Sequence, residues 1–252
     1  PVVTGGGTAR LVGADWVIWA KAPDRFEAGT PAIANVIAFA RALLLTRRFG
    51  NHAFDGPAAV TQTAAEILQR DEFDKRSGQE LLRELRQTLI GRGRRVPTVE
   101  GARPYVNLDN AASTPTFEPI WAAVCETWRQ PAHVQHAVIQ EARAIVADYV
   151  GAPPSEYDVI FTANTTEAIN LVAESTGRAG EARHHSVVIN TLLEHNSNEL
   201  PWRTVPGASL ARLPMDAEGF LDLGQLETWL RAHGEDGDHG ATRVSLVAVS
   251  GA

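Results

Sequence analysis

The distribution of hydrophobic and polar residues along the chain changes near residue 105. From there on, short apolar runs predict strands at 105–108, 158–162, 186–190, 209–213 and 244–249. Between these runs, apolar residues at helical spacing predict helices at 117–129, 136–150, 165–175, 194–203 and 221–232. Strands that alternate with helices are typical of a mainly parallel sheet covered on both faces, so we expect a three-layer αβα fold of the α/β class.

The residues before this region divide into two blocks. In block 1–50, the segment Leu11–Trp19 is rich in Val, Ile and Trp and is typical of a strand, and Pro31 opens an expected helix. Block 51–104 is interpreted as a helical connector that leads into block 105–252. Its expected elements are helices at 60–70 and 79–90 and a basic loop at 91–97.

Composition narrows the possible partners and the compartment. With 23 Lys+Arg against 30 Asp+Glu, the net charge is −7, so we expect no nucleic acid partner and interpret the basic loop as solvent-exposed. A single cysteine, Cys125, excludes a disulfide framework and fits a reducing, cytoplasmic compartment. We expect no membrane partner, because no apolar run reaches spanning length and no signal peptide is visible. The only methionine is Met215, so we expect a piece of a longer chain.

Candidate binding residues follow two neighbouring strands of the expected sheet, where ligands bind in such folds. Asn164 is a favoured N-cap residue and Glu167 completes a capping-box-like pattern. The first-turn N–H groups and hydroxyls of Thr165 and Thr166 are then suited to a phosphate, although a plain helix cap has the same pattern. His195 follows the next strand and is suited to stacking on a flat ring or to acid–base work, with a surface or capping histidine as the alternative.

Three segments taken together carry a resemblance to a known family. Residues 105–115 (YVNLDNAASTP), 159–173 (VIFTANTTEAINLVA) and 194–202 (EHNSNELPW) resemble class V aminotransferases, and most of all the cysteine desulfurase and selenocysteine lyase branch. The resemblance implies an incomplete large domain of fold type I that binds pyridoxal 5′-phosphate (PLP) and acts on a small amino acid.

The resemblance also implies roles for individual residues. Asn164, Thr165 and Thr166 would hold the PLP phosphate, although the family usually has Gly at the first of these positions. His195 would stack on the pyridine ring. The loop Asp109–Ser113 would lie near the substrate carboxylate, whereas its small side chains alone also fit a bland tight loop. Its expected substrate-binding residues are Asn110, Ala111 and Ala112.

Block 1–50 is similar to a later part of the same family. Residues 5–7 and 19–34 resemble the segment that follows the cofactor-binding lysine. In the family, the threonine that corresponds to Thr30 reaches the PLP phosphate of the partner subunit, which implies a homodimer, and Arg25 belongs to the same loop and is an expected substrate-binding residue. A late segment thus precedes an early one, as in a tandem fusion or a circular permutation.

The lysine that binds PLP covalently in the family has no counterpart among the matching positions. The chain contains only Lys21 and Lys75, and neither fits, so we expect no catalytic residue in this chain. We expect a fragment of a PLP-dependent enzyme; the alternative is a non-catalytic module of the same fold that completes a neighbouring site or mediates dimerisation. Sulfur removal from cysteine, another lyase step and transamination all stay open. Cys125 is interpreted as a packed helix residue, and no metal site is expected.

Overall fold

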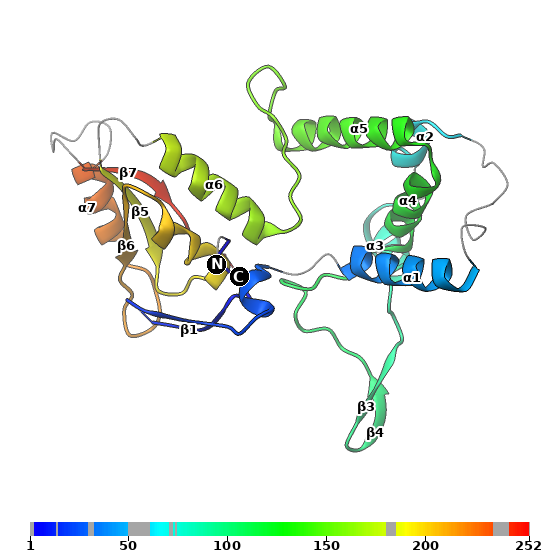
Figure 1. Ribbon diagram of the computed structural model, residues 1–252, viewed down its shortest axis with the longest axis horizontal. Helices are drawn as coiled ribbons and strands as arrows, with labels where there is room; N and C mark the ends of the chain where they lie inside the picture. The colour runs from blue at the N-terminus through cyan, green and yellow to red at the C-terminus, as the bar shows by residue number, and fades with distance from the viewer. Residues whose placement is uncertain are drawn as a thin grey trace. The chain divides into compact units, whose positions relative to one another are not determined.

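The computed structural model of the chain is shown in Figure 1. It forms two compact units: the first unit combines residues 1–53 with 161–252, and the second unit is residues 54–160. The residues described are 3–13, 15–29, 33–49, 61–70, 73, 75–179, 185–233 and 242–251. The first unit therefore brings together the two segments that resemble a late and an early part of one family.

The first unit is built on a parallel three-stranded sheet in the order β6-β5-β7. In the central strand, Ile189 pairs with Ala211 on one side and Val247 on the other. The parallel sheet predicted for this part of the chain is confirmed. The elements of the unit are β1 (Ala9–Val12), β2 (Val17–Trp19), η1 (Asp24–Phe26), α1 (Ile33–Phe49), α6 (Thr165–Ala179), β5 (His185–Thr191), η3 (Asn196–Asn198), η4 (Pro201–Thr204), β6 (Ala208–Leu213), α7 (Leu223–His233) and β7 (Thr242–Val247).

Helices α6 and α7 cover opposite faces of this sheet, as Figure 1 shows. Val188 packs with Ala173 of α6 and with Trp202, whereas Ile189 packs in a cluster that includes Trp229 of α7. Successive side chains of a strand point to opposite faces, so neighbouring residues of β5 enter different cores. This gives the expected helix–sheet–helix layering over the C-terminal part of the chain.

Two expected strands, 105–108 and 158–162, are not strands in the structure. Both are apolar, but a strand is stable only beside a hydrogen-bonded neighbour, and neither finds one among the described residues. Their large side chains stay exposed, with Leu108 92% and Ile160 68% accessible. The prediction was wrong because apolar composition cannot reveal whether a pairing partner is present.

Other differences have local causes. The segment 11–19 forms the antiparallel hairpin β1–β2 in place of one strand, because the chain turns where Gly13 N–H donates to the Trp16 carbonyl at 2.8 Å. The expected helix 194–203 is divided into two short 3-10 helices, η3 and η4. Pro201 has no N–H group and cannot donate the hydrogen bond that would join them. The helix after Pro31 is formed as α1, with exposed apolar side chains such as Phe39.

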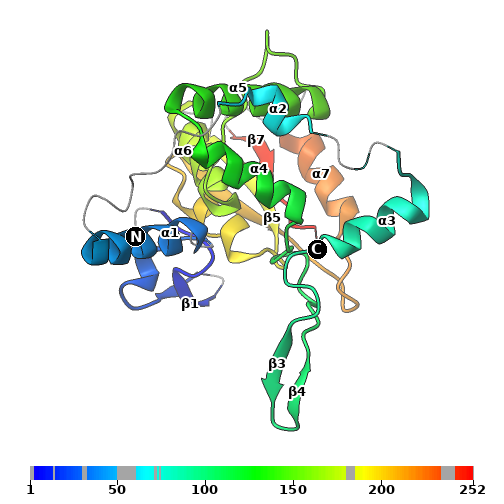
Figure 2. The same ribbon diagram turned by 90° about the vertical axis from the view of Figure 1, so that its right-hand side faces the viewer.

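The second unit is mainly helical. Its small core joins Ile67 of α2 to Val134 and Val138 of α5. Figure 2 shows α2 against α5 and the β3–β4 hairpin extending away from these helices. Residues 95–97 of the expected basic loop belong to strand β3. The elements are α2 (Ala64–Leu68), α3 (Gly78–Gln87), β3 (Arg95–Thr98), β4 (Gly101–Pro104), α4 (Glu118–Arg129) and α5 (Ala132–Val150).

No helix in the described part of the chain is both long and apolar enough to span a membrane.

Candidate functional site

The turn before α6 is capped by side chains at both of its ends. The Asn164 Oδ1 accepts a hydrogen bond from the Glu167 N–H at 2.9 Å. The Glu167 carboxylate in turn accepts from the Ala163 N–H at 2.7 Å. The predicted capping pattern is confirmed, with the glutamate binding one residue earlier than in a standard capping box. The start of α6 is therefore fixed by its own sequence.

The first turn of α6 has free donors. The main-chain N–H groups of Thr165 and Thr166 have no hydrogen-bond partner among the described residues. They lie at the positive end of the helix dipole, so an anion there would be stabilised. Thr165 is exposed, whereas Thr166 is buried and its hydroxyl lies 2.7 Å from the hydroxyl of Ser197. The second hydroxyl is thus turned inward, not toward solvent.

His195 lies in the loop after β5 and caps the short helix η3. Its Nδ1 accepts a hydrogen bond from the Ser197 N–H at 3.2 Å. A neutral imidazole that accepts at Nδ1 carries its proton on Nε2. His195 is exposed. Because Ser197 also contacts Thr166, the first turn of α6 and His195 lie close together beside the end of β5.

The N-terminal segment packs onto the same place. The Gly6 N–H donates to the Ser197 Oγ at 3.1 Å, and the Gly29 N–H donates to the Gly6 carbonyl at 2.8 Å. The main chain of Thr4 pairs with the Asn170 amide through two hydrogen bonds of 3.2 and 2.7 Å. The N-terminal segment resembles a late part of the family, and the region of α6 and Ser197 resembles an early part. The two therefore contact each other within a single chain.

Glycine is required where this segment approaches the site. A Cβ atom on Gly6 would lie 3.0 Å from His195 Cε1, and one on Gly29 would lie 2.6 Å from the Asn164 side-chain amide. Gly29 also has a φ of +79°, which L side chains rarely adopt. The loop that carries Arg25 is thereby held against the start of α6.

Arg25 lies in η1 with its guanidinium 5.4 Å from the centroid of the Phe26 ring. Its Nε atom is buried and has no hydrogen-bond partner among the described residues. A buried guanidinium donor without an acceptor is suited to an incoming carboxylate or phosphate. Thr30, the other residue expected from this loop, lies outside the described residues.

The loop Asp109–Ser113 belongs to the second unit. It is closed by its own hydrogen bonds, since the Ser113 N–H and hydroxyl donate to the Asp109 carbonyl at 2.8 and 3.0 Å. Asn110, Ala111 and Ala112 are exposed. Their expected place near the substrate carboxylate stays a prediction.

Glu194 joins three elements beside His195. Its carboxylate accepts hydrogen bonds from the Thr191 hydroxyl at 2.7 Å, the Asn198 amide at 2.8 Å and the Ser250 N–H at 2.7 Å. Partial burial raises the pKa of Glu194, but these hydrogen bonds outweigh it and hold the pKa below its ordinary value of 4.5. The charged carboxylate therefore helps to fix the loop that carries His195.

A lowered pKa predicts acid sensitivity. The stabilisation from Glu194 is fully present above pH 4.5 and is lost as the pH falls through the lower pKa of the folded state. We expect the urea midpoint to fall in acid, and to fall less steeply in Glu194→Gln, which is already less stable at neutral pH. Midpoints from pH 7 to 3 test this, with exposed Glu218→Gln as a control that follows the wild-type curve. Parallel curves for wild type and Glu194→Gln would contradict the assignment.

Sequence reasoning missed Ser197 and an ion-pair network. Glu199 Oε1 lies 2.6 Å from a guanidinium nitrogen of Arg203 and 2.6 Å from one of Arg212. Arg203 also donates to the Gly13 carbonyl at 2.9 Å, which ties the β1–β2 hairpin to the unit. The Glu199–Arg203 spacing of four residues was a usable signal. Nothing local in the sequence indicates the roles of Arg212 and Ser197.

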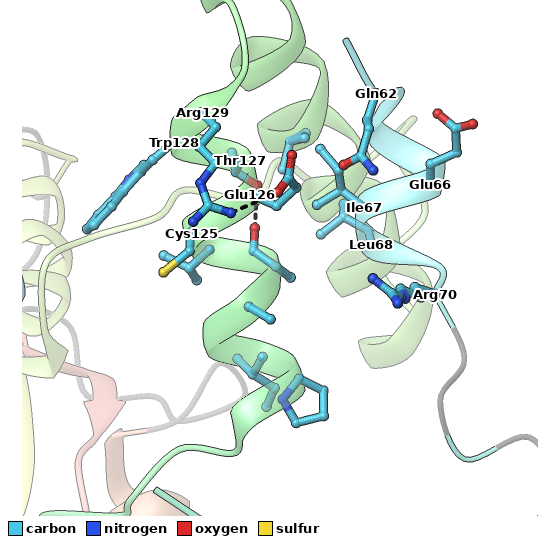
Figure 3. A pocket seen from close by; sticks show the side chains of 16 residues that line it. Gln62, Glu66, Ile67, Leu68, Arg70, Cys125, Glu126, Thr127, Trp128 and Arg129 are labelled. Carbon is cyan, nitrogen blue, oxygen red and sulfur yellow. Dashed lines mark hydrogen bonds and ion pairs between the residues drawn. The ribbon is translucent and has the colours of Figure 1, made fainter. Parts of the chain in front are cut away.

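The second unit contains a groove of about 790 Å³ between α2 and α4. Figure 3 shows Ile67 and Leu68 facing α4, whereas Cys125 and Trp128 point from the other side of that helix. Cys125 is half-buried, as expected for a packed helix residue. None of the predicted site residues lines this groove.

The sequence of the chain is similar to those of several cysteine desulfurases or probable cysteine desulfurases. A probable cysteine desulfurase of Mycolicibacterium paratuberculosis is 35% identical over 167 residues, which cover 61% of this chain and 22% of that protein. A cysteine desulfurase of Dickeya dadantii is 39% identical over 97 residues, covering 37% of this chain and 23% of that protein. One of an Enterobacter species is 33% identical over 161 residues, covering 58% and 37%.

The chain spans between 22% and 37% of the length of these three relatives. The family described as aminotransferase class-V matches residues 1–79 and 106–235, which include both the N-terminal segment and the α6–β5 region. The chain therefore belongs to the class V aminotransferase family.

Proposed function

We propose that this chain supplies the cofactor-binding part of a PLP-dependent enzyme of fold type I that acts on a small amino acid. Class V aminotransferases and cysteine desulfurases are PLP-dependent. The observation that carries the proposal is that Ser197 contacts Thr166, Gly6 and His195. The first turn of α6 and the histidine are therefore close neighbours. Cysteine desulfuration is the preferred reaction, because the three relatives reported above are cysteine desulfurases or probable ones. A cytoplasmic homodimer is part of the proposal.

The residues present fit the cofactor's phosphate. Two N–H groups without a partner in the described part of the chain, the exposed hydroxyl of Thr165 and the dipole of a 15-residue helix converge at the start of α6. Asn164 holds this turn through its capping bond, and Thr166 contributes from the buried side. Thr30 is proposed to reach the same phosphate from a partner subunit.

The remaining residues act on the ring and the substrate. His195, which is exposed, is proposed to stack on the pyridine ring. Arg25, whose buried Nε has no hydrogen-bond partner among the described residues, is proposed to bind the substrate carboxylate. Asn110, Ala111 and Ala112 are proposed as substrate-binding residues on the resemblance alone. When bound, PLP supplies an electron sink for negative charge at the substrate's α-carbon.

The chain's own lysines are not proposed to take part. Lys21 and Lys75 are both exposed, and Lys75 lies in the second unit. We therefore propose that this chain holds the cofactor without a covalent bond. A cofactor analogue that cannot react with lysine is then a fair probe of the pocket.

Binding of pyridoxamine 5′-phosphate tests the proposal. We expect it to bind at least about tenfold more tightly than pyridoxamine, because the phosphate gains charge-assisted hydrogen bonds at α6. Thr165→Val should weaken the phosphate-bearing ligand about tenfold and leave pyridoxamine unaffected. Titration calorimetry measures both. Thr176→Val, which removes a hydroxyl bonded to the Val172 carbonyl on the same helix, is the matched control. Equal affinity for the two ligands would overturn the proposal.

A further inference from the structure

The geometry points to Ser197 as a positioning residue of the proposed cofactor site. Its hydroxyl connects two groups from distant parts of the chain, and its main-chain N–H connects them to a neighbouring residue of its own loop. The distant groups are the loop of residues 5–7, called the glycine loop below, and the first turn of α6. The neighbouring residue is His195, whose ring accepts from the Ser197 N–H. The inference rests on the proposed function, since it assigns Ser197 to the same site.

The contacts of Ser197 are short and enclosed. Its Oγ accepts from the Gly6 N–H at 3.1 Å and lies 2.7 Å from the Thr166 Oγ1, 191 and 31 residues away in the sequence. Ser197 is 7% exposed and Thr166 is 3% exposed, so water competes little for these bonds. A bond of this kind fixes the distance between the two segments that build the site.

The count of protons in this cluster indicates a missing acceptor. Two hydroxyl groups carry two protons, and only one of these lies between Ser197 and Thr166. Either hydroxyl could donate in this contact, and when Ser197 donates to Thr166 it also accepts from the Gly6 N–H. The proton of Thr166 is then left without an acceptor among the described residues. A phosphate oxygen at the start of α6 supplies one, and this completes a chain of donors that runs from Gly6 to the anion.

The same residue sets the imidazole. The Ser197 N–H donates to the His195 Nδ1, which holds the orientation of the ring. Loss of the Ser197 hydroxyl leaves this N–H in place but frees the loop from Gly6 and Thr166. The effect on His195 is therefore indirect, as expected of a positioning residue and not of a catalytic one.

Ser197→Ala tests the inference through two measurements on the whole chain. We expect pyridoxamine 5′-phosphate to bind about tenfold more weakly, and its induced circular dichroism to fall at saturating ligand. We also expect hydrogen exchange of the Gly6 amide to speed up about tenfold without ligand, because its acceptor is gone. Ser175→Ala is the control. It removes a hydroxyl that donates to the Leu171 carbonyl at an exposed position of α6, and it should change neither the affinity nor the exchange rate by more than about twofold.

A second variant approaches the bond from its other end. Thr166→Val keeps the shape of the side chain and removes the hydroxyl, so it should weaken the same ligand. The double variant should be no weaker than the worse single variant, because both remove one link. Additive losses, or a variant with a lower melting temperature and unchanged ligand affinity, would overturn the inference.

The outcomes separate the inference from the proposed function. If wild type binds the phosphate ligand and Ser197→Ala binds it equally well, Ser197 has no positioning role and the proposed function stands. If wild type does not prefer the phosphate ligand over pyridoxamine, the proposed function fails and the inference falls with it. Protection of the Gly6 amide then shows whether the hydrogen bond itself is present.

Discussion

Replacing Glu199 with glutamine is expected to destabilise the first unit by about 3 kcal/mol, in the range known for removing one partner of a buried ion pair. The Glu199 side chain is 9% exposed and its Oε1 contacts both Arg203 and Arg212, whose side chains are 18% and 21% exposed. Glutamine keeps the shape but leaves two guanidinium groups facing a neutral amide. The attraction between the carboxylate and those two positive charges, which offsets part of the cost of burying them, is then lost.

The network also has a mechanical consequence. Arg203 holds the carbonyl of Gly13 in the β1–β2 hairpin, and the bond spans 190 residues of sequence. Arg212 belongs to β6, so Glu199 links the N-terminal segment to the sheet. We expect the variant to loosen the hairpin together with the sheet edge.

Urea denaturation of the whole chain measures the loss. Glu227→Gln is the matched control, because Glu227 forms an ion pair with Arg231 whose side chains are 63% and 79% exposed. Such an exposed pair contributes between about 0 and 1 kcal/mol. A loss for Glu199→Gln as small as that of the control would show that the network is not coupled to folding.

An element of this fold was predictable from the sequence where its own residues determine it. It was not predictable where it depends on residues far away in the sequence. The start of α6 was predictable because Asn164 and Glu167 cap the helix they begin. Strand β5 was predictable because its residues are apolar and β-branched. The segment 105–108 is also mostly apolar and yet is no strand, since pairing depends on a neighbour that composition does not specify.

The candidate site divides along the same line. His195 and the turn of Thr165 and Thr166 were found because each follows a predicted strand or begins a predicted helix. Their joining residue was not found, because Ser197 is a small residue in a loop and its partners lie far away in sequence. Only the resemblance of residues 5–7 to a late segment of the family indicated that the glycine loop belongs to the site. Contacts made by tertiary packing leave no periodic pattern to read.

Gly5→Ala is expected to have an effect of similar size, about 3 kcal/mol, and to weaken the phosphate ligand as well. A Cβ atom on Gly5 would lie 2.3 Å from the Cγ2 of Thr166, and the backbone has a φ of +152°. Overpacking and a disfavoured backbone each cost about 1–3 kcal/mol. Thr166 can avoid the methyl group only by rotating its side chain, which breaks the bond to Ser197.

A compensating substitution separates the two causes. Thr166→Ser removes Cγ2 and keeps the hydroxyl, so the double variant Gly5→Ala/Thr166→Ser should recover the part of stability and affinity that the clash removed. Gly207→Ala is the control, since Gly207 has a φ of +72° with open space around it and reports the backbone cost alone, about 1 kcal/mol. If Gly5→Ala costs no more than Gly207→Ala and the second substitution restores nothing, the glycine loop does not pack on α6 in solution. The packing of the N-terminal segment against α6 and Ser197 would then be in doubt as a feature of the folded chain, because Gly5 and Gly6 form part of that contact.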